Sequence, residues 1–211
     1  MKVAIIGAGN VGRTLGGAWG RRGHDVSYGV RDPEDPKYAA LNGHATTNDG
    51  AVQAADVVVL CTPWQATERA VAECGDLTGK VVIDCTNPLS ADFSSLVVGH
   101  TSSGAEELAE RIGRGRLVCA FNTVPSEVLL DVFAARRKAA RPGLVYYGDD
   151  ARAKKVAAEL IRDLGFDPVD AGPLRIARYA EPFALLVAQL AYEGEGGPEL
   201  AYRFVRFPSS G

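Results

Sequence analysis

Apolar residues along the chain fall into short, nearly continuous runs that alternate with longer stretches of mixed polarity. Runs of this kind are typical of parallel strands that are buried on both faces. We expect strands at 2–7, 25–30, 56–61, 80–85, 116–121, 143–148 and, with a weaker pattern, 166–172. The stretches between them predict helices near 11–22, 64–75, 104–113 and 150–165. This alternation predicts an α/β fold, a Rossmann-type doubly wound parallel sheet with a small C-terminal helical extension.

The pattern divides the chain into two parts. Residues 1–172 form the predicted NAD(P)-binding Rossmann domain, including an extra βαβ unit, and residues 173–211 form a C-terminal helical segment. A helix is expected at 172–192, where Pro182 requires a kink or a new helical start.

This last helix has an unusual surface. From Phe183 to Tyr192 the only strongly polar side chain is Gln189, and a helix that is apolar all round must be covered on every side. The segment is shorter than the roughly 20 residues of a membrane span. We therefore predict a homodimer in which a second copy covers the helix. The alternative is a tail folded back as ordinary core.

A glycine fingerprint follows the first strand. Gly7, Gly9 and Gly12 form G-x-G-x-x-G between an apolar strand and a helix, the context in which this motif binds a dinucleotide. Gly7 permits the tight turn, Gly9 lets the backbone approach a pyrophosphate, and Gly12 lets the helix pack on the strand. The helix N-terminus offers unpaired N–H groups to the phosphates.

The end of the second strand separates the two nicotinamide cofactors. An NAD site has an acidic residue there, whereas an NADP site has a cation for the 2′-phosphate. The stretch "SYGVRDP" has Gly29 and Val30 at this place, followed by Arg31, whose planar guanidinium suits a phosphate. Asp32 and Pro33 resemble a helix N-cap and first helical residue, which would give Asp32 a local role. We predict NADP.

Three further strand ends pair Thr or Asn with Pro, in "CTPWQA" (61–66), "DCTNPL" (84–89) and "AFNTVPS" (120–126). Ligands of doubly wound sheets bind outside these carboxyl ends. The loops offer neutral hydrogen-bonding groups and Trp64 for stacking on a ring. No catalytic acid, base or nucleophile is assigned, because hydride transfer between stacked rings depends mainly on positioning. His100 is the one histidine in an expected mouth loop.

Composition narrows the function classes. The chain has 211 residues and a net charge of −3, which gives no reason to expect nucleic acid. The four cysteines have no CxxC spacing and the three histidines do not cluster, so no metal site is expected. No signal peptide or membrane span is apparent. We expect a cytoplasmic protein that acts on a small molecule.

The motifs resemble those of the NADP oxidoreductases that use coenzyme F420, a deazaflavin. The resemblance extends over nearly the whole chain and is most specific in "YYGDD" and "DAGPLRIARYAEPFALL", with "IIGAGNVG", "YGVRDP", "TPW", "DCTNPL" and "AFNTVPS" beside them. The cytoplasmic reductase domain of membrane ferric reductases is similar too. In the F420 family, hydride passes between the nicotinamide and the deazaflavin, and the subunits form homodimers through the C-terminal part.

The resemblance implies a set of cofactor-binding residues. Those of the glycine loop would be Gly7, Ala8, Gly9, Asn10, Val11 and Gly12, with Arg31 at the 2′-phosphate. Thr62, Pro63 and Trp64 would line the cofactor groove, and Asn87, Asn122, Thr123 and Pro125 would border the nicotinamide and the second ring. Ala8 and Val30 stand where the family can have hydroxyl side chains, and Asn122 stands where it can have a histidine.

The sequence therefore predicts an NADPH-dependent oxidoreductase that transfers hydride between NADP and coenzyme F420. Two alternatives stay open. One is a reductase acting on FMN, FAD or a ferric chelate, and the other is a non-catalytic module that binds NADP.

Overall fold

The computed structural model describes residues 1–138 and 140–207. One eight-stranded sheet runs through the molecule in the order β3-β2-β1-β4-β5-β6-β7-β8. The six strands from β3 to β6 are parallel in the order of a Rossmann fold. The predicted fold class is confirmed, with one departure: β7 runs antiparallel to β6, and β8 is parallel to β7.

The strands are β1 (Lys2–Ile6), β2 (Asp25–Gly29), β3 (His44–Thr46), β4 (Val57–Leu60), β5 (Val81–Asp84), β6 (Arg116–Ala120), β7 (Gly143–Tyr147) and β8 (Asp167–Asp170). The helices are α1 (Asn10–Arg21), α2 (Asn48–Ala54), α3 (Trp64–Ala72), α4 (Gly104–Ile112), α5 (Val128–Ala135), α6 (Ala151–Leu164) and α7 (Ala177–Tyr192). Two short 3-10 helices, η1 (Pro36–Tyr38) and η2 (Leu174–Ile176), precede β3 and α7.

Every strand and helix expected from the apolar pattern is present. All four residues of β4 and all four of β5 are buried, as a central parallel strand requires. The pattern missed α2, α5 and the three-residue strand β3. α2 is short and polar, and its first turn depends on Thr47 as N-cap, whose hydroxyl accepts a hydrogen bond from the Gly50 amide. α5 is a nearly continuous apolar stretch, which lacks the polar stripe of an amphipathic helix.

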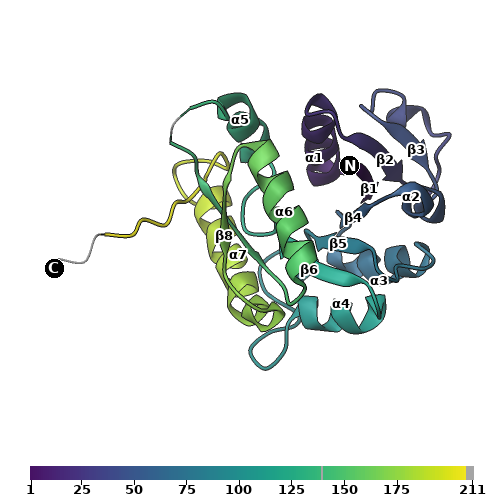
Figure 1. The fold of residues 1–211 in the computed structure, drawn as a ribbon. Coiled ribbons are helices and arrows are strands. Elements are labelled where there is room, and N and C mark those ends of the chain that lie inside the picture. Colours follow the sequence, from purple (N-terminus) through teal and green to yellow (C-terminus); the bar gives the residue numbers. More distant parts are fainter. Residues whose placement is uncertain (139, 208–211) are drawn as a thin grey trace.

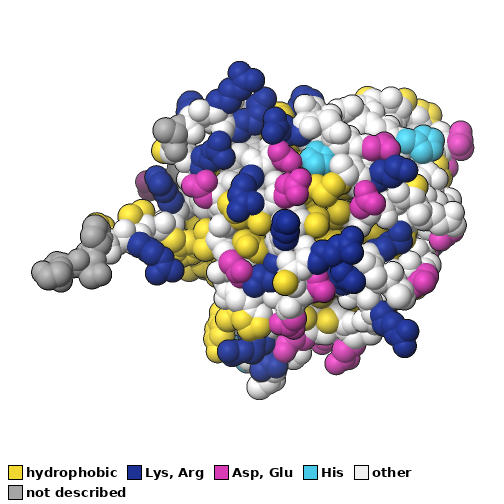
Figure 2. Space-filling view, in the orientation of Figure 1, with side chains coloured by type: hydrophobic (Ala, Val, Ile, Leu, Met, Phe, Trp, Pro, Cys, Tyr) yellow, Lys and Arg dark blue, Asp and Glu magenta, His cyan; other side chains and the backbone are white. Residues whose placement is uncertain are grey.

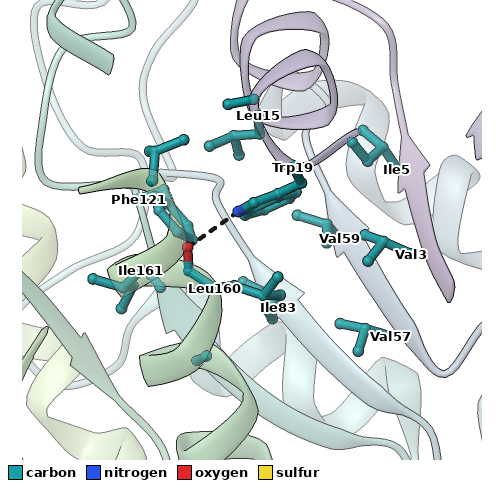
Figure 3. Close-up of a cluster of buried hydrophobic side chains, with 14 of the residues drawn as sticks. Val3, Ile5, Leu15, Trp19, Val57, Val59, Ile83, Phe121, Leu160 and Ile161 are labelled. Carbon is teal, nitrogen blue, oxygen red and sulfur yellow. Dashed lines mark hydrogen bonds between the residues drawn. The ribbon is translucent and has the colours of Figure 1, made fainter. Parts of the chain in front are cut away.

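Helices cover both faces of the sheet (Figure 1). The largest core cluster joins one face of the strands to α1, α5 and α6, and the clusters on the other face involve α2, α3, α4 and α7. Trp19 of α1 is fully buried at the centre of the first cluster (Figure 3). Its indole N–H donates to the Leu160 carbonyl at 3.1 Å, and Phe121 meets its ring edge-on at 5.6 Å. The β1–β6 half is thereby joined to the β7–β8 unit.

The C-terminal helix follows η2 directly. α7 contains Pro182 in its interior rather than beginning there. Its buried residues include Ala177, Ala184 and Val187, whereas Leu186 and Leu190 are each 55% exposed. The chain itself thus covers only one face of α7. In Figure 2 hydrophobic side chains gather at the surface beside the point where the C-terminal tail leaves the molecule.

The segment after α7 returns to the sheet before it ends. The Gly143 amide at the start of β7 donates to the Tyr202 carbonyl at 2.8 Å, and Phe183 of α7 meets the Tyr202 ring edge-on at 5.1 Å. The last four residues of the predicted C-terminal segment lie outside the described residues. Within the described part of the chain, no helix has the length and apolar character needed to cross a bilayer.

Candidate functional site

The glycine loop between β1 and α1 has the geometry of a dinucleotide cradle. Gly7 has φ +101°, and a Cβ there would lie 2.9 Å from the Cys61 carbonyl oxygen. A Cβ on Gly12 would lie 2.1 Å from the Gly7 carbonyl oxygen, so this glycine brings α1 against the loop. A Cβ on Gly9 would meet nothing within 4 Å. Gly7 and Gly12 are therefore required by packing, whereas Gly9 leaves open space in front of the helix.

The N-terminus of α1 is left available for an anion. Its N-cap residue is Gly9, so no side chain caps the helix, and both Gly9 and Asn10 are exposed. Arg13 holds the loop from the side, because its guanidinium donates to the Ala8 carbonyl at 2.8 Å and to the Lys37 carbonyl at 3.1 Å. The residues present fit a pyrophosphate.

The end of β2 has no room for a carboxylate. A Cβ on Gly29 would lie 2.7 Å from the Asn48 Oδ1 and 2.8 Å from the Ile6 side chain. Val30 is buried in the core, and Arg31 is the first exposed side chain after the strand. Asn48 of α2 thus occupies the space that the side chain of an NAD-binding acidic residue would need at position 29. The first exposed side chain after this point is that of Arg31, a cation.

The prediction that Asp32 and Pro33 begin a helix is wrong. The cap lies three residues later, where the Asp35 carboxylate accepts a hydrogen bond from the Lys37 amide at 3.0 Å and Pro36 begins η1. Asp32 is exposed in the turn before it. The reason is that the chain needs one more turn, closed by the bond from the Asp35 amide to the Asp32 carbonyl, before it can enter η1.

The loops after β5 and β6 are joined by a pair of amides. Asn87 Nδ2 donates to the Asn122 carbonyl at 2.8 Å, and Asn122 Nδ2 donates to Asn87 Oδ1 at 3.2 Å and to the Tyr147 hydroxyl at 2.9 Å. The structure thus brings these two predicted site residues together. Asn87 is half-buried at the edge, and Asn122 is buried behind it.

Thr123 and Pro125 are also buried. The Thr123 hydroxyl lies 2.7 Å from the Tyr202 hydroxyl, which accepts a hydrogen bond from the Val145 amide at 3.0 Å. The buried side chains of Thr123 and Pro125 therefore support the loop from behind. Sequence reasoning missed Tyr147 and Tyr202, because nothing local marks a tyrosine that bonds to a residue so distant in the chain.

Phe121 begins this loop in a left-handed conformation, with φ +66°. A side chain other than glycine pays a backbone cost there of about 1–3 kcal/mol. The edge-on contact with Trp19 fixes the ring in the core. The strained residue turns the chain sharply at the end of β6, next to Asn122.

The loop after β4 supplies the remaining predicted groups. The Thr62 hydroxyl bonds to the Thr67 hydroxyl at 3.0 Å, Pro63 is the N-cap residue of α3, and Trp64 is its first residue. Thr62 and Trp64 are half-buried, and Pro63 is exposed. These groups lie at the carboxyl end of β4, which neighbours the glycine loop after β1.

Two carboxyl groups are buried near this edge of the sheet. Asp84 Oδ1 accepts a hydrogen bond from the Thr86 amide at 2.9 Å, and burial raises the pKa of Asp84 to about 6. Glu181 of α7 accepts two backbone hydrogen bonds, and burial raises its pKa to about 7. Burial likewise raises the pKa of the Cys85 thiol, with Cys61 beside it. Both carboxyl groups thus bind backbone amides behind the surface of the site, Asp84 in the loop after β5 and Glu181 at the start of α4.

His100 has a positive φ of +63° and lies exposed in the long loop between β5 and α4. Within residues 1–138 and 140–207, His, Cys, Asp and Glu side chains do not form a group of three that could hold a metal ion.

Comparison with known proteins agrees with this geometry. The sequence profile of the family "NADP oxidoreductase coenzyme F420-dependent" matches residues 2–88. The F420-dependent NADP reductase of Methanothermobacter thermautotrophicus is 30% identical over 210 residues, which covers 90% of this chain and 89% of that protein. The metalloreductase STEAP3 of Rattus norvegicus is 29% identical over 186 residues, 87% of this chain, but this chain spans only 36% of STEAP3.

Solved structures lead to the same family. A crystal structure named for an F420-dependent NADP reductase of Arthrobacter sp. FB24 superposes with a TM-score of 0.87 and 28% identity, covering 98% of this chain and all of that one. An imine reductase from Aspergillus terreus, at 18% identity and a TM-score of 0.65, shares the fold over 89% of this chain and 60% of its own. The chain therefore belongs to the family of coenzyme F420-dependent NADP oxidoreductases and is an NADP-dependent oxidoreductase.

Proposed function

We propose that this protein transfers hydride between NADPH and coenzyme F420. The observation that supports this most directly is the 30% identity to an F420-dependent NADP reductase over nearly the full length of both chains. NADPH supplies the hydride when it is bound. The protein binds and orients the two rings, and reduction of the acceptor takes up one proton with each hydride.

The proposed cofactor site follows the edge of the sheet. The amides of Gly9, Asn10, Val11 and Gly12 face the pyrophosphate, with Ala8 beside them, because the α1 N-terminus is uncapped and open. Arg31 binds the 2′-phosphate, since it is the first exposed side chain after β2.

The proposed second half of the site lies at the ends of β4, β5 and β6. Thr62, Pro63 and Trp64 line the groove that leads to the nicotinamide. Asn87 and the backbone of residues 122–125 border the two rings, with Asn122, Thr123 and Pro125 supporting them from behind. Neutral amide groups of this kind orient flat rings without adding a competing base.

A flavin or a ferric chelate is the alternative acceptor. It is favoured by the similarity to the metalloreductase STEAP3, which extends over 87% of this chain. The third possibility is a module that binds NADP without turnover.

Steady-state oxidation of NADPH with a panel of acceptors separates these functions. Purified protein is mixed with NADPH and, in turn, F420, FMN, FAD or ferric citrate, and the absorbance of NADPH and of each acceptor is followed. The expected result is the fastest turnover with F420. Turnover with only a flavin or ferric citrate replaces the deazaflavin assignment, and NADPH binding without turnover of any acceptor identifies a binding module.

We also propose that the protein works in the cytoplasm as a homodimer. All four cysteines are free thiols, as in a reducing compartment. The division into a cofactor-binding part, 1–172, and a dimerising part, 173–211, is part of the same proposal. It is supported by the exposed apolar face of α7.

A further inference from the structure

Two polar side chains of α7, one turn apart, contact the first turn of α4. The Arg178 guanidinium donates to both carboxylate oxygens of Glu106, at 2.7 and 2.8 Å. Glu181 accepts a hydrogen bond from the Gly104 amide and another from the Ala105 amide, each at 3.0 Å. The Arg178 side chain is 40% exposed, whereas Glu181 is 2% exposed. The Arg178–Glu106 ion pair is thus accessible to solvent, whereas the hydrogen bonds of Glu181 are buried.

The Glu181 carboxylate costs free energy in this place. Burial penalises its charge, and Asp84 of β5 and Glu106 of α4 add repulsion. The N-terminus of α4 is already capped by Ser103, whose hydroxyl accepts a hydrogen bond from the Glu106 amide and donates one to the Glu106 carboxylate. The helix therefore does not need Glu181 in order to begin at this residue. A buried charge is weak evidence for stability. We therefore infer that the two hydrogen bonds that Glu181 accepts from the Gly104 and Ala105 amides serve mainly to fix the position of the α4 N-terminus.

The first residue of α4 lies directly against a loop of the candidate site. A Cβ on Gly104 would lie 3.1 Å from three ring carbons of Pro88, so no free space separates them. Pro88 follows Asn87, which exchanges two hydrogen bonds with Asn122. A shift of the α4 N-terminus therefore acts directly on the loop that joins the ends of β5 and β6.

We propose that Glu181 is a positioning residue: by fixing the first turn of α4 against Pro88, it holds the Asn87–Asn122 pair at the edge where the nicotinamide and its partner ring meet. The identity of those rings rests on the proposed function, but the link from α7 to the loop does not. Glu181 acts from behind the site and touches neither ring.

Three variants test this role. Glu181→Gln keeps the shape but replaces one acceptor with an N–H donor, and Glu181→Asp keeps the charge but shortens the reach. Glu106→Gln is the matched control, because it breaks the ion pair with Arg178 and leaves the two bonds of Glu181, while glutamine preserves the bond to Ser103. Thermal unfolding establishes that each variant folds.

The main readout is hydrogen exchange at the Thr86 and Leu89 amides, which bond to the Asp84 carboxylate and the Asn87 carbonyl. We expect about tenfold faster exchange in both Glu181 variants and no change in Glu106→Gln, since a hydrogen bond to a charged group is worth about a factor of ten or more. With the acceptor that the unmodified protein reduces fastest, kcat should fall about tenfold, while the NADPH Kd stays within about threefold because the glycine loop is untouched.

The opposite results overturn the proposal. Exchange at Leu89 that is unchanged in Glu181→Gln, or raised equally in Glu106→Gln, would show that α7 only packs against α4. If the unmodified protein reduces no acceptor, the proposed function fails, and the exchange measurement still decides the role of Glu181. If Glu181→Gln does not fold, Glu181→Asp gives the answer by the same measurement, and unchanged exchange at the Leu89 amide in that variant overturns the proposal.

Discussion

The glycines of the loop after β1 differ in what surrounds them, and this difference separates folding from binding. Gly12 has a carbonyl oxygen 2.1 Å from the place of a Cβ, whereas Gly9 has open space there and an ordinary φ of −79°. An alanine at each position therefore disturbs a different property of the protein.

We expect Gly12→Ala to lower the free energy of unfolding by about 1–3 kcal/mol, because α1 must move off the loop. Gly9→Ala should change stability by less than about 1 kcal/mol, the loss of a modest N-cap, yet weaken NADPH binding at least about tenfold, because the methyl group occupies the space of the phosphate. Urea unfolding and NADPH titration of both variants check this pair. A folded Gly9→Ala protein with unchanged NADPH affinity would contradict the assignment of the pyrophosphate site to this loop.

Arg31 determines the choice between the two nicotinamide cofactors if the 2′-phosphate lies at the end of β2. We expect NADPH to bind more tightly than NADH, and Arg31→Ala to remove most of the difference. A charge-assisted hydrogen bond is worth about 1.5–3 kcal/mol, or roughly tenfold to a hundredfold in Kd.

The control for this comparison is Arg152→Ala, which removes an exposed arginine of α6. Calorimetric titration of the three proteins with NADPH and with NADH gives the ratio of the two Kd values for each protein. Equal Kd values for the two cofactors in the unmodified protein would contradict the assignment of Arg31.

At the scale of elements, all strands except the three-residue β3 were predictable, and so were their directions except at the pairing of β6 with β7. A buried strand is marked by a continuous apolar run, as in Val57–Leu60, whichever way it runs. The antiparallel pairing of β7 with β6 follows from the path through α5 and the loop after it, where no local residue signals a reversal.

The candidate site was predictable to the same extent. Spacing alone identified Gly7 and Gly12, because backbone sterics act within a few residues. It did not reveal that Asn122 and Thr123 are held by Tyr147 and Tyr202, because those bonds join residues 25 and 79 positions apart.

The interfaces of α7 with α4 and of β5 with β6 contain two buried carboxyl groups, and these predict how stability depends on pH. The folded-state pKa values of Asp84, about 6, and Glu181, about 7, lie above their ordinary values. Each group therefore binds its proton more tightly in the folded state, so its contribution to stability is complete below about pH 4 and is lost as the pH rises through 6 to 7. The free energy of unfolding should fall between pH 5 and pH 8.

Asp84→Asn should flatten this slope, since an amide keeps the acceptor for the Thr86 amide without a charge. The effect of Asp84 is on the order of 3 kcal/mol over its full titration. Urea unfolding at four pH values and constant ionic strength measures it. Asp92, whose pKa is lowered to about 2 by Ser90 and Ser94, loses its charge only in stronger acid and does not affect the comparison. If the free energy of unfolding depends on pH in the same way in Asp84→Asn and in the unmodified protein, the raised pKa of Asp84 is contradicted.

For the whole molecule, the question is what covers the outer face of α7. Tyr179, Leu186 and Leu190 are each more than half exposed, and their spacing of seven and four residues places them on one side of the helix. The tail adds Phe204, which is exposed and whose ring centroid lies 6.5 Å from that of Phe183 in α7. Monomers seldom leave so many large apolar side chains together in water. A two-fold axis beside α7 would cover this face with the same face of a second copy.

We therefore expect a homodimer at micromolar concentration and a monomer for Leu186→Glu, because two carboxylates would be buried opposite each other at the axis. Ala151→Glu adds the same charge at the exposed start of α6 and should leave the dimer intact. Light scattering gives the mass of each protein, and thermal unfolding at several concentrations should show a Tm that rises with concentration for the unmodified protein only. The variant folds as a monomer in this prediction, since Leu186 contributes little to the core of its own chain. A monomeric mass for the unmodified protein, or a dimeric mass for Leu186→Glu, would mean that α7 does not lie at the interface.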